Sequence, residues 1–234
     1  MKILTINVPF IPEDAVAEYR SIDAIESLGL PPQHNETRGE RIVEFAGRTC
    51  YQSYNRPNPN TKDIKDYLAN IIAQGHESVL EHAFFSFYVE GVSRNLLLEL
   101  ERHRHLSFSV ISQRFVNSAD TPMITPPALR EGEAWEWDHA VAATRDAYQA
   151  VVKALTEQGL TRKEVREAAR AILPGGVETK FVVSGNVRAW RDVLKKRYSV
   201  HADAEIRELA SLVLGELRWY VPNMMQDFPE EPFK

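Results

Sequence analysis

The sequence predicts a single α+β domain, in which a small and mostly antiparallel sheet is flanked by several helices. Hydrophobic residues recur at helical spacing over much of the chain, and only a few short segments have the composition of strands. No internal repeat, low-complexity tract or interdomain linker is recognisable. The 234 residues, 44% of them hydrophobic, could bury one full core or two small ones. We expect residues 1–234 to form one domain, with residues 1–40 and 222–234 at its periphery.

Three segments are expected to form strands. Lys2–Val8 alternates weakly between polar and apolar residues, and Thr179–Ser184 has strand propensity. Ala83–Val89 is rich in aromatic residues, which is typical of a buried strand, and Gly91 is expected to bound it.

Apolar spacing and end signals predict the helices. They are expected at Arg41–Tyr51, from Thr61 to a stop at Gly75, at Ser93–Arg104, at Glu133–Gln158, from Thr161 to Pro174, at Asn186–Lys195 and at Ala204–Trp219. Thr161 and Glu164 have the spacing of a capping box. The turn-rich and proline-rich segments are expected to be loops, namely Pro9–Gly39, Asn55–Asn60 and Thr121–Leu129.

Composition indicates the compartment and excludes some partners. A formal net charge of -5 argues against broad nucleic-acid binding, which normally needs a basic face. The single cysteine, Cys50, allows no intramolecular disulfide and favours a reducing compartment. The first ten residues are too polar for a signal peptide, and no apolar run is long enough to span a bilayer. We expect a soluble, cytoplasmic protein.

Glu99–Arg114 is the segment around which we expect the chain to be organised. From Arg102 onward it holds three arginines, two histidines, three serines and one glutamine, but no acid. Guanidinium forks and serine hydroxyls match phosphate and carboxylate groups. Cations are also favoured at the end of a helix, which is the simpler explanation for the first of them. The interleaved Phe108 and Val110 favour a ligand site instead.

His76, Glu77, Glu81 and His82 form a second cluster, for which three interpretations stay open. The histidines are six residues apart, whereas a zinc-binding helix carries them four apart. A metal site is therefore the weakest interpretation. A hydrogen-bonded structural role is stronger, and participation in the site of an organic cofactor is favoured over both.

Nucleophilic catalysis has little support in the sequence. Cys50 lies in an apolar setting with no base nearby in sequence, which is more typical of packing than of a nucleophile. Ser112 lacks the glycine-flanked elbow of a hydrolase serine. No glycine-rich phosphate loop is present, so side chains and helix ends would have to hold any nucleotide.

Two further basic clusters lie near expected helix ends. Arg162–Arg170 has the spacing of a solvated helix face, but Arg170 leads into an apolar segment and is expected to have a partner. The second cluster comprises Arg188, Arg191 and Lys195–Arg197.

Arg102-His103-Arg104, followed after seven residues by Ser112, is similar to the R-H-R-x7-S signature of the flavin-dependent thymidylate synthases. Other segments resemble family segments in the same order, namely Phe45–Ser53, Gly75–His82, Ala169–Pro174, Gly185–Trp190 and Arg197–Ile206. The resemblance covers Val43 to Ala210 and leaves out both ends of the chain.

This resemblance implies a methyltransferase that makes dTMP from dUMP, with methylenetetrahydrofolate as carbon donor and NADPH as reductant acting through FAD. It implies a homotetramer that holds each FAD and dUMP between subunits. These ligands are anionic, so a local basic cluster on an acidic chain agrees with the resemblance. A flavin hydride activates the uracil without a cysteine nucleophile, which agrees with the position of Cys50.

The resemblance also implies roles for residues at matching positions. Those that would contact FAD are Ser78, Arg102, His103, Arg104, Asn186, Val187, Arg188, Asp192 and His201. Those that would hold dUMP are Glu99, Leu100, Glu101, Arg102, Val110, Ile111, Ser112, Gln113, Arg114, Arg170 and Arg197. Arg197 would polarise the uracil and is the expected catalytic residue. No metal ligand is implied.

The chain departs from the family at three positions. Val110 stands where members often have glutamate or glutamine, Phe115 where tyrosine is usual, and Asp192 where asparagine or histidine is more common. The rival hypotheses are a histidine-rich, metal-dependent nucleotide phosphohydrolase and a nucleotide-binding module without enzymatic activity.

Overall fold

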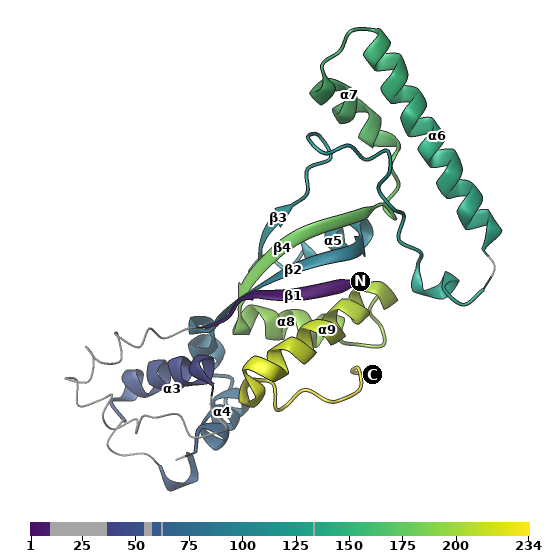
Figure 1. Ribbon diagram of the computed structural model, residues 1–234. Helices are drawn as coiled ribbons and strands as arrows, with labels where there is room; N and C mark the ends of the chain where they lie inside the picture. Colours follow the sequence, from purple (N-terminus) through teal and green to yellow (C-terminus); the bar gives the residue numbers. More distant parts are fainter. Residues whose placement is uncertain (10–36, 54–57, 62, 133) are drawn as a thin grey trace.

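The computed structural model describes residues 1–9, 37–53, 58–61, 63–132 and 134–234 (Figure 1). Its strands are β1 (Lys2–Asn7), β2 (Phe84–Ser93), β3 (Ser107–Val110) and β4 (Glu178–Asn186). Its α-helices are α3 (Arg38–Tyr51), α4 (Ile64–Ala73), α5 (Arg94–Leu100), α6 (Trp135–Glu157), α7 (Arg162–Ala169), α8 (Val187–Arg197) and α9 (Ala204–Tyr220). Its 3-10 helices are η2 (Pro59–Thr61), η3 (Glu77–His82), η4 (Pro127–Leu129), η5 (Arg170–Ile172) and η6 (Pro222–Met224).

The strands form one antiparallel sheet in the order β1-β2-β4-β3, which confirms the predicted α+β class. Alternation along β2 turns Phe85, Phe87 and Val89 toward the core, where each is fully buried. On the opposite face, Ser86 and Ser184 are paired across the sheet, and their hydroxyl oxygens lie 2.8 Å apart.

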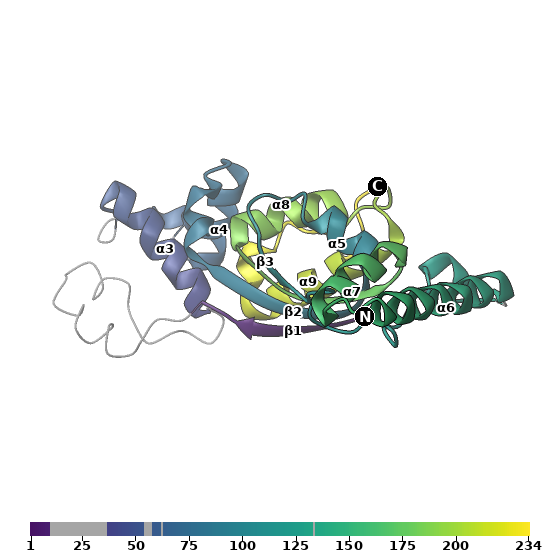
Figure 2. The same cartoon turned by 90° about the horizontal axis from the view of Figure 1, so that it is seen from above.

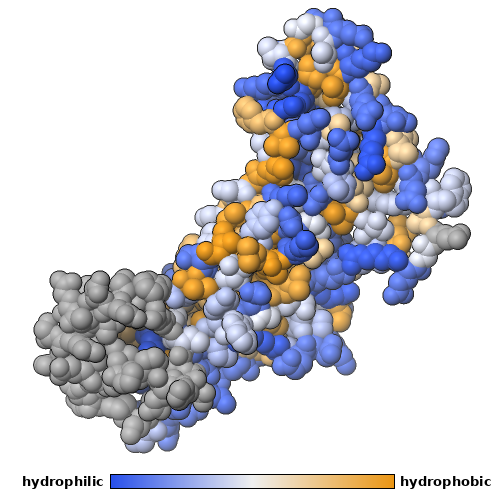
Figure 3. Space-filling view, in the orientation of Figure 1, coloured by the Kyte–Doolittle hydropathy of each residue, from blue (hydrophilic) through white to orange (hydrophobic). Residues whose placement is uncertain are grey.

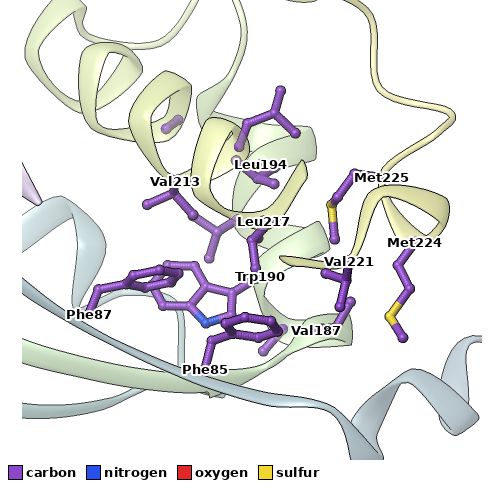
Figure 4. Close-up of a cluster of buried hydrophobic side chains, with 14 of the residues drawn as sticks. Phe85, Phe87, Val187, Trp190, Leu194, Val213, Leu217, Val221, Met224 and Met225 are labelled. Carbon is purple, nitrogen blue, oxygen red and sulfur yellow. The ribbon is translucent and has the colours of Figure 1, made fainter. Parts of the chain in front are cut away.

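The core lies between the inner face of the sheet and the helices α8 and α9 (Figure 4). Trp190 of α8 meets Phe87 edge-on, with ring centroids 5.1 Å apart, and Leu194 and Leu217 complete the contact. Truncating a buried aromatic residue of this kind to alanine costs about 3–5 kcal/mol. This packing fixes α8 against β2 and β4, so the side chains on its remaining surface have defined positions.

The helices α8 and α9 cover the same side of the sheet (Figure 2). The opposite face is the one seen in Figures 1 and 3, where apolar residues gather over the strands. It includes Leu4, Ile6 and Phe84, whose exposed fractions are 60%, 49% and 43%. Helices α6 and α7 form an arm that stands away from the sheet (Figure 1). Helix α6 has 23 residues, and Tyr148 alone is buried among them.

Several predicted boundaries are wrong for local physical reasons. Strand β2 continues past Gly91 because a register shift between Val89 and Val92 accommodates this residue and its positive φ of 70°. Helix α4 begins after Asp63, whose side chain accepts the N–H of Lys65, and not at Thr61.

Other boundaries differ near the site. Helix α5 ends at Leu100, so Arg102–Arg104 lies in the turn that follows it and not in a helix. Strand β3 was not predicted, because its four residues form a strand only through pairing with β4. Helix α7 ends at Ala169, before the 3-10 turn η5. Most of the predicted loop from Pro9 to Gly39, and part of that at residues 55–60, lie outside the described residues.

Candidate active site

The basic turn after α5 is packed against the junction between β4 and α8. Leu106, at the end of this turn, is 9% exposed and belongs to the hydrophobic core. A Cβ atom at Gly185 would lie 2.5 Å from the Leu106 Cδ2 atom, so any larger residue there would force the buried Leu106 side chain to shift. The turn is therefore held beside the helix that carries Arg197.

Arg197, in the last turn of α8, is held by residues of the α5 segment. Its Nε donates to His103 Nε2 at 3.1 Å, and its two terminal nitrogens donate to Glu99, at 2.7 Å to the carboxylate and 3.3 Å to the carbonyl. These bonds use three of the five guanidinium N–H groups and leave two. The side chain is 21% exposed, so it is fixed but can still be reached by a ligand.

His103 and Asp192 continue the cluster. His103 Nδ1 lies 3.6 Å from Asp192 Oδ2, and Lys196 binds the same carboxylate at 2.7 Å. Burial lowers the pKa of His103, and the charge of Arg197 lowers it further, although Asp192 opposes both. Burial acts to raise the pKa of Asp192, but the bonds from Lys196 and His103 hold it below its usual value. The arrangement favours a neutral imidazole beside a carboxylate anion.

The first turn of α8 carries a second group of predicted residues. Asn186 caps the helix through the N–H of Ala189, which leaves its amide N–H groups available. Arg188 binds Glu81 of η3 at 2.5 Å, and Ser78 lies on the same 3-10 helix. Val187 is fully buried and donates its N–H to the Ala83 carbonyl, so its side chain packs in the core.

Arg191, between these two groups, was not predicted as an important residue. Its side chain is fully buried, donates twice to Asp227 at 2.6 and 2.7 Å and once to the Met224 carbonyl, and lies over the Phe228 ring. Glu77 lies 3.7 Å away and also accepts a hydrogen bond from Lys195. Asp227 is 36 positions away from Arg191 in the sequence, so no local pattern indicates this pair.

The segment after β3 forms a third group. Ile111 continues the pairing with β4 by donating to the Lys180 carbonyl. Arg114 then forms an ion pair with Glu167 of α7, with Nε and Oε2 2.9 Å apart. The partly exposed Val110, Ser112 and Gln113 lie on the same segment. Little in the sequence indicated that Glu167 pairs with Arg114, because Glu167 lies among basic residues whose spacing is typical of a solvent-exposed helix face.

Several predicted basic residues have side chains without a partner among the described residues. The exposed side chains of Arg102, Arg104, Arg170 and His201 form no hydrogen bond or ion pair there, although the His201 N–H donates to the Ser199 hydroxyl. For Arg170 this contradicts the expectation of a partner within the fold. Unpaired guanidinium groups on fixed backbone suit a phosphate or diphosphate ligand.

The single chain unites only part of the predicted site. Helix α8 links Arg197, Glu99, His103 and Asp192 at one end with Asn186 and Arg188 at the other. Within the part of the chain that the structure describes, no hydrogen bond or ion pair joins the third group around Arg114 to either of these. Leu100 and Glu101 accompany the first group, Leu100 as a buried core residue and Glu101 as an exposed one.

The other candidate residues have different environments. Glu77 and Glu81 are engaged with cations on α8, and no group of three or more potential metal ligands occurs among the described residues. Cys50 is exposed at the end of α3, so the expected packing role is wrong. In the described ranges, no helix combines the length and apolarity that crossing a bilayer would require.

Together, fold and site define an α+β protein in which carboxylates orient a cluster of arginine and lysine side chains. A family model described as "Thymidylate synthase complementing protein" matches residues 34–223. The "Probable flavin-dependent thymidylate synthase" of Mycobacterium phage L5 is 48% identical over 218 residues, which cover 90% of this chain and 89% of the relative. The "Flavin-dependent thymidylate synthase" of Mycobacterium marinum is 45% identical over 201 residues, which cover 81% and 80%. The chain therefore belongs to this family, and it is an enzyme of the flavin-dependent thymidylate synthase type.

Proposed function

We propose that the protein converts dUMP to dTMP, with methylenetetrahydrofolate as the carbon donor and NADPH as the reductant acting through FAD. The observation that carries the proposal is the guanidinium of Arg197, which is fixed by three hydrogen bonds and has two N–H groups left. The family membership supplies the reaction, and this geometry supplies a residue able to act on the uracil.

The residues present fit a dinucleotide such as FAD. Arg102 and Arg104 would bind its diphosphate, because both are exposed and unpaired among the described residues. Asn186 would donate its amide N–H groups, and Arg188 and Ser78 would contact the cofactor from the other end of α8. FAD, when bound, supplies hydride transfer. The chain itself contributes binding, orientation and electrostatic stabilisation.

Arg197 would hold a carbonyl oxygen of the uracil and stabilise negative charge that develops on the ring. It cannot act as a base, since an arginine keeps its proton in proteins. Glu99 and His103 hold the guanidinium before the substrate arrives, so little reorganisation is needed during the reaction. Arg114 and Arg170 would bind the phosphate of dUMP, for which Arg114 must share its contact with Glu167.

The absorption spectrum tests this proposal. We expect the purified protein to absorb in the visible flavin bands, and we expect Arg102→Ala to lose most of this absorbance without unfolding. Asn117→Ala, on an exposed loop residue, serves as the matched control. A colourless protein that takes up no added FAD would contradict the assignment.

We also propose that residues 1–234 act as one catalytic domain that assembles into a homotetramer. Within one chain, no described hydrogen bond or ion pair joins the residues around Arg114 to those around Arg197. A second subunit would bring its own Arg114 segment to the Arg197 cluster. The exposed apolar residues Leu4, Ile6 and Phe84 on the outer face of the sheet, and the α6–α7 arm, offer surfaces for such contacts. Light scattering should report a tetramer, whereas an active monomer would contradict this part of the proposal.

The rival hypotheses are less favoured. The family membership does not favour a metal-dependent phosphohydrolase, and Glu77 and Glu81 already pair with arginine and lysine side chains. A binding module without turnover would bind dUMP and FAD but form no dTMP.

A further inference from the structure

A continuous chain of polar contacts leads to the guanidinium of Arg197. Lys196 binds the carboxylate of Asp192, this carboxylate faces His103 Nδ1, and His103 Nε2 accepts from Arg197 Nε. Glu99 completes the chain on the far side of the guanidinium. All five residues lie on α8, on α5 or in the turn that follows α5.

The contact between Arg197 and His103 determines the tautomer of the imidazole. A guanidinium group has only donors, so the ring nitrogen facing it must offer its lone pair. The proton of the neutral ring is therefore on Nδ1, the nitrogen that faces Asp192 at 3.6 Å. A carboxylate at this position favours that tautomer because it can only accept when ionised. Protonation of Nε2 would break the bond to Arg197.

We propose that His103 and Asp192 are positioning residues that set the direction of the Arg197 guanidinium. Glu99 accepts hydrogen bonds from the two terminal nitrogens of Arg197, and by itself it would allow the guanidinium to rotate about the carboxylate. His103 accepts from the third nitrogen, Nε, and so fixes the orientation of the group. Asp192 acts one step further away, by keeping the His103 proton on Nδ1. This role rests on the proposed function of Arg197 and differs from the cofactor contact that the family resemblance implies for both residues.

The surroundings of His103 support this role. Its side chain is 7% exposed, which disfavours the imidazolium form, and the nearby charges of Arg197 and Lys196 act in the same direction. Asp192 is the acid that faces the ring, while Glu99 is engaged with Arg197. The neighbouring Arg102 and Arg104 side chains are exposed, and neither forms a hydrogen bond or ion pair with another described residue, including His103.

A matched pair of variants tests the proposal on the full chain. His103→Gln keeps an oxygen that can accept from Arg197 Nε, whereas His103→Leu removes the acceptor at similar size. We expect kcat for dTMP formation to fall at least about tenfold in His103→Leu, with recovery of most of that loss in His103→Gln. The dissociation constant for FAD, measured by fluorescence titration, should change less than about threefold in both variants. Equal loss of kcat in the two variants, or loss of FAD binding in both, would overturn the proposal.

Crystal structures of the same variants test the proposal independently of turnover. The Arg197 guanidinium should move from its wild-type position in His103→Leu and keep it in His103→Gln. An unmoved guanidinium in His103→Leu would overturn the positioning role, even in an active enzyme. If the wild-type protein formed no dTMP, the proposed function would fail, but the crystal structures would still decide the positioning role. Asp192→Asn, which keeps an oxygen acceptor, should behave like His103→Gln, and Asp192→Leu should resemble His103→Leu.

Discussion

The middle of α8 and its last turn hold their arginines in different ways. Arg191 is fully buried, and its terminal nitrogens are occupied by Asp227 and the Met224 carbonyl. Arg197 is 21% exposed and keeps two N–H groups after three hydrogen bonds. Both arginines make three hydrogen bonds, and the buried Nε of Arg191 has no hydrogen-bond partner among the described residues. Burial therefore distinguishes them: no ligand can reach the free N–H groups of Arg191, whereas those of Arg197 are accessible.

The largest effect is expected from Arg191→Met. This variant leaves Asp227 without its partner, and breaking a buried ion pair by removing one member costs about 3–5 kcal/mol. Because the Asp227 side chain is 38% exposed, we expect the lower end of that range. Urea unfolding measures the loss of stability, and the folded fraction should keep its turnover. An unchanged free energy of unfolding would show that Arg191 is not structural.

Arg197→Lys should have the opposite pattern. Lysine keeps the charge but loses the planar fork that binds Glu99 and His103, so we expect turnover to fall at least about tenfold, or about 1.4 kcal/mol. Complete loss of a fixed donor of this kind costs about 10²–10³ in rate. FAD binding and the melting temperature should be close to those of the wild type. Near-normal turnover would reduce Arg197 to a surface residue.

The sequence indicated the helix that carries both arginines better than it indicated their partners. Asn186 is a recognisable N-cap at the start of α8, and the sequence placed Arg197 near the other end of this helix. The capping box at Thr161 and Glu164 likewise marks the start of α7. The contacts that distinguish the two arginines are distant, since Glu99 lies 98 positions from Arg197 in the sequence. Such pairs arise only from the fold.

The same limit applies to the sheet and the site. The aromatic-rich strand β2 was predicted, because its pattern lies within the segment itself. Strand β3 was missed, because Ser107–Val110 becomes a strand only beside β4. The basic residues were found by type and by family resemblance. The acidic partners Glu167 and Asp227 came from the structure alone.

A smaller effect is expected when pH changes the charge of His103. Its pKa in the folded protein lies below the ordinary value of 6.5, so the unfolded chain binds a proton first as the pH falls. The neutral ring therefore stabilises the folded state above pH 6.5, and this contribution is lost as the pH falls toward the lower folded pKa. Urea unfolding at pH 7.5 and 5.5 should show a loss of stability that is smaller in His103→Gln. An equal loss in both proteins would show that another group titrates.

The smallest effect is expected for Cys50→Ala. Cys50 is exposed at the end of α3, away from both arginines in sequence, so its removal should change stability by less than about 0.5 kcal/mol. The variant should keep substantial thymidylate-forming activity. Complete loss of activity in a folded Cys50→Ala protein would indicate a thiolate mechanism and a different role for the last turn of α8.

The most direct test of the central claim is an assay of dTMP formation from labelled dUMP, with methylenetetrahydrofolate and NADPH, before and after removal of FAD. Arg197→Lys, assayed with FAD, completes the set. We predict dTMP formation by the wild-type protein that disappears with FAD, returns when FAD is added back, and falls at least about tenfold in Arg197→Lys. Formation of dTMP that persists without flavin, or that does not depend on Arg197, would contradict the account.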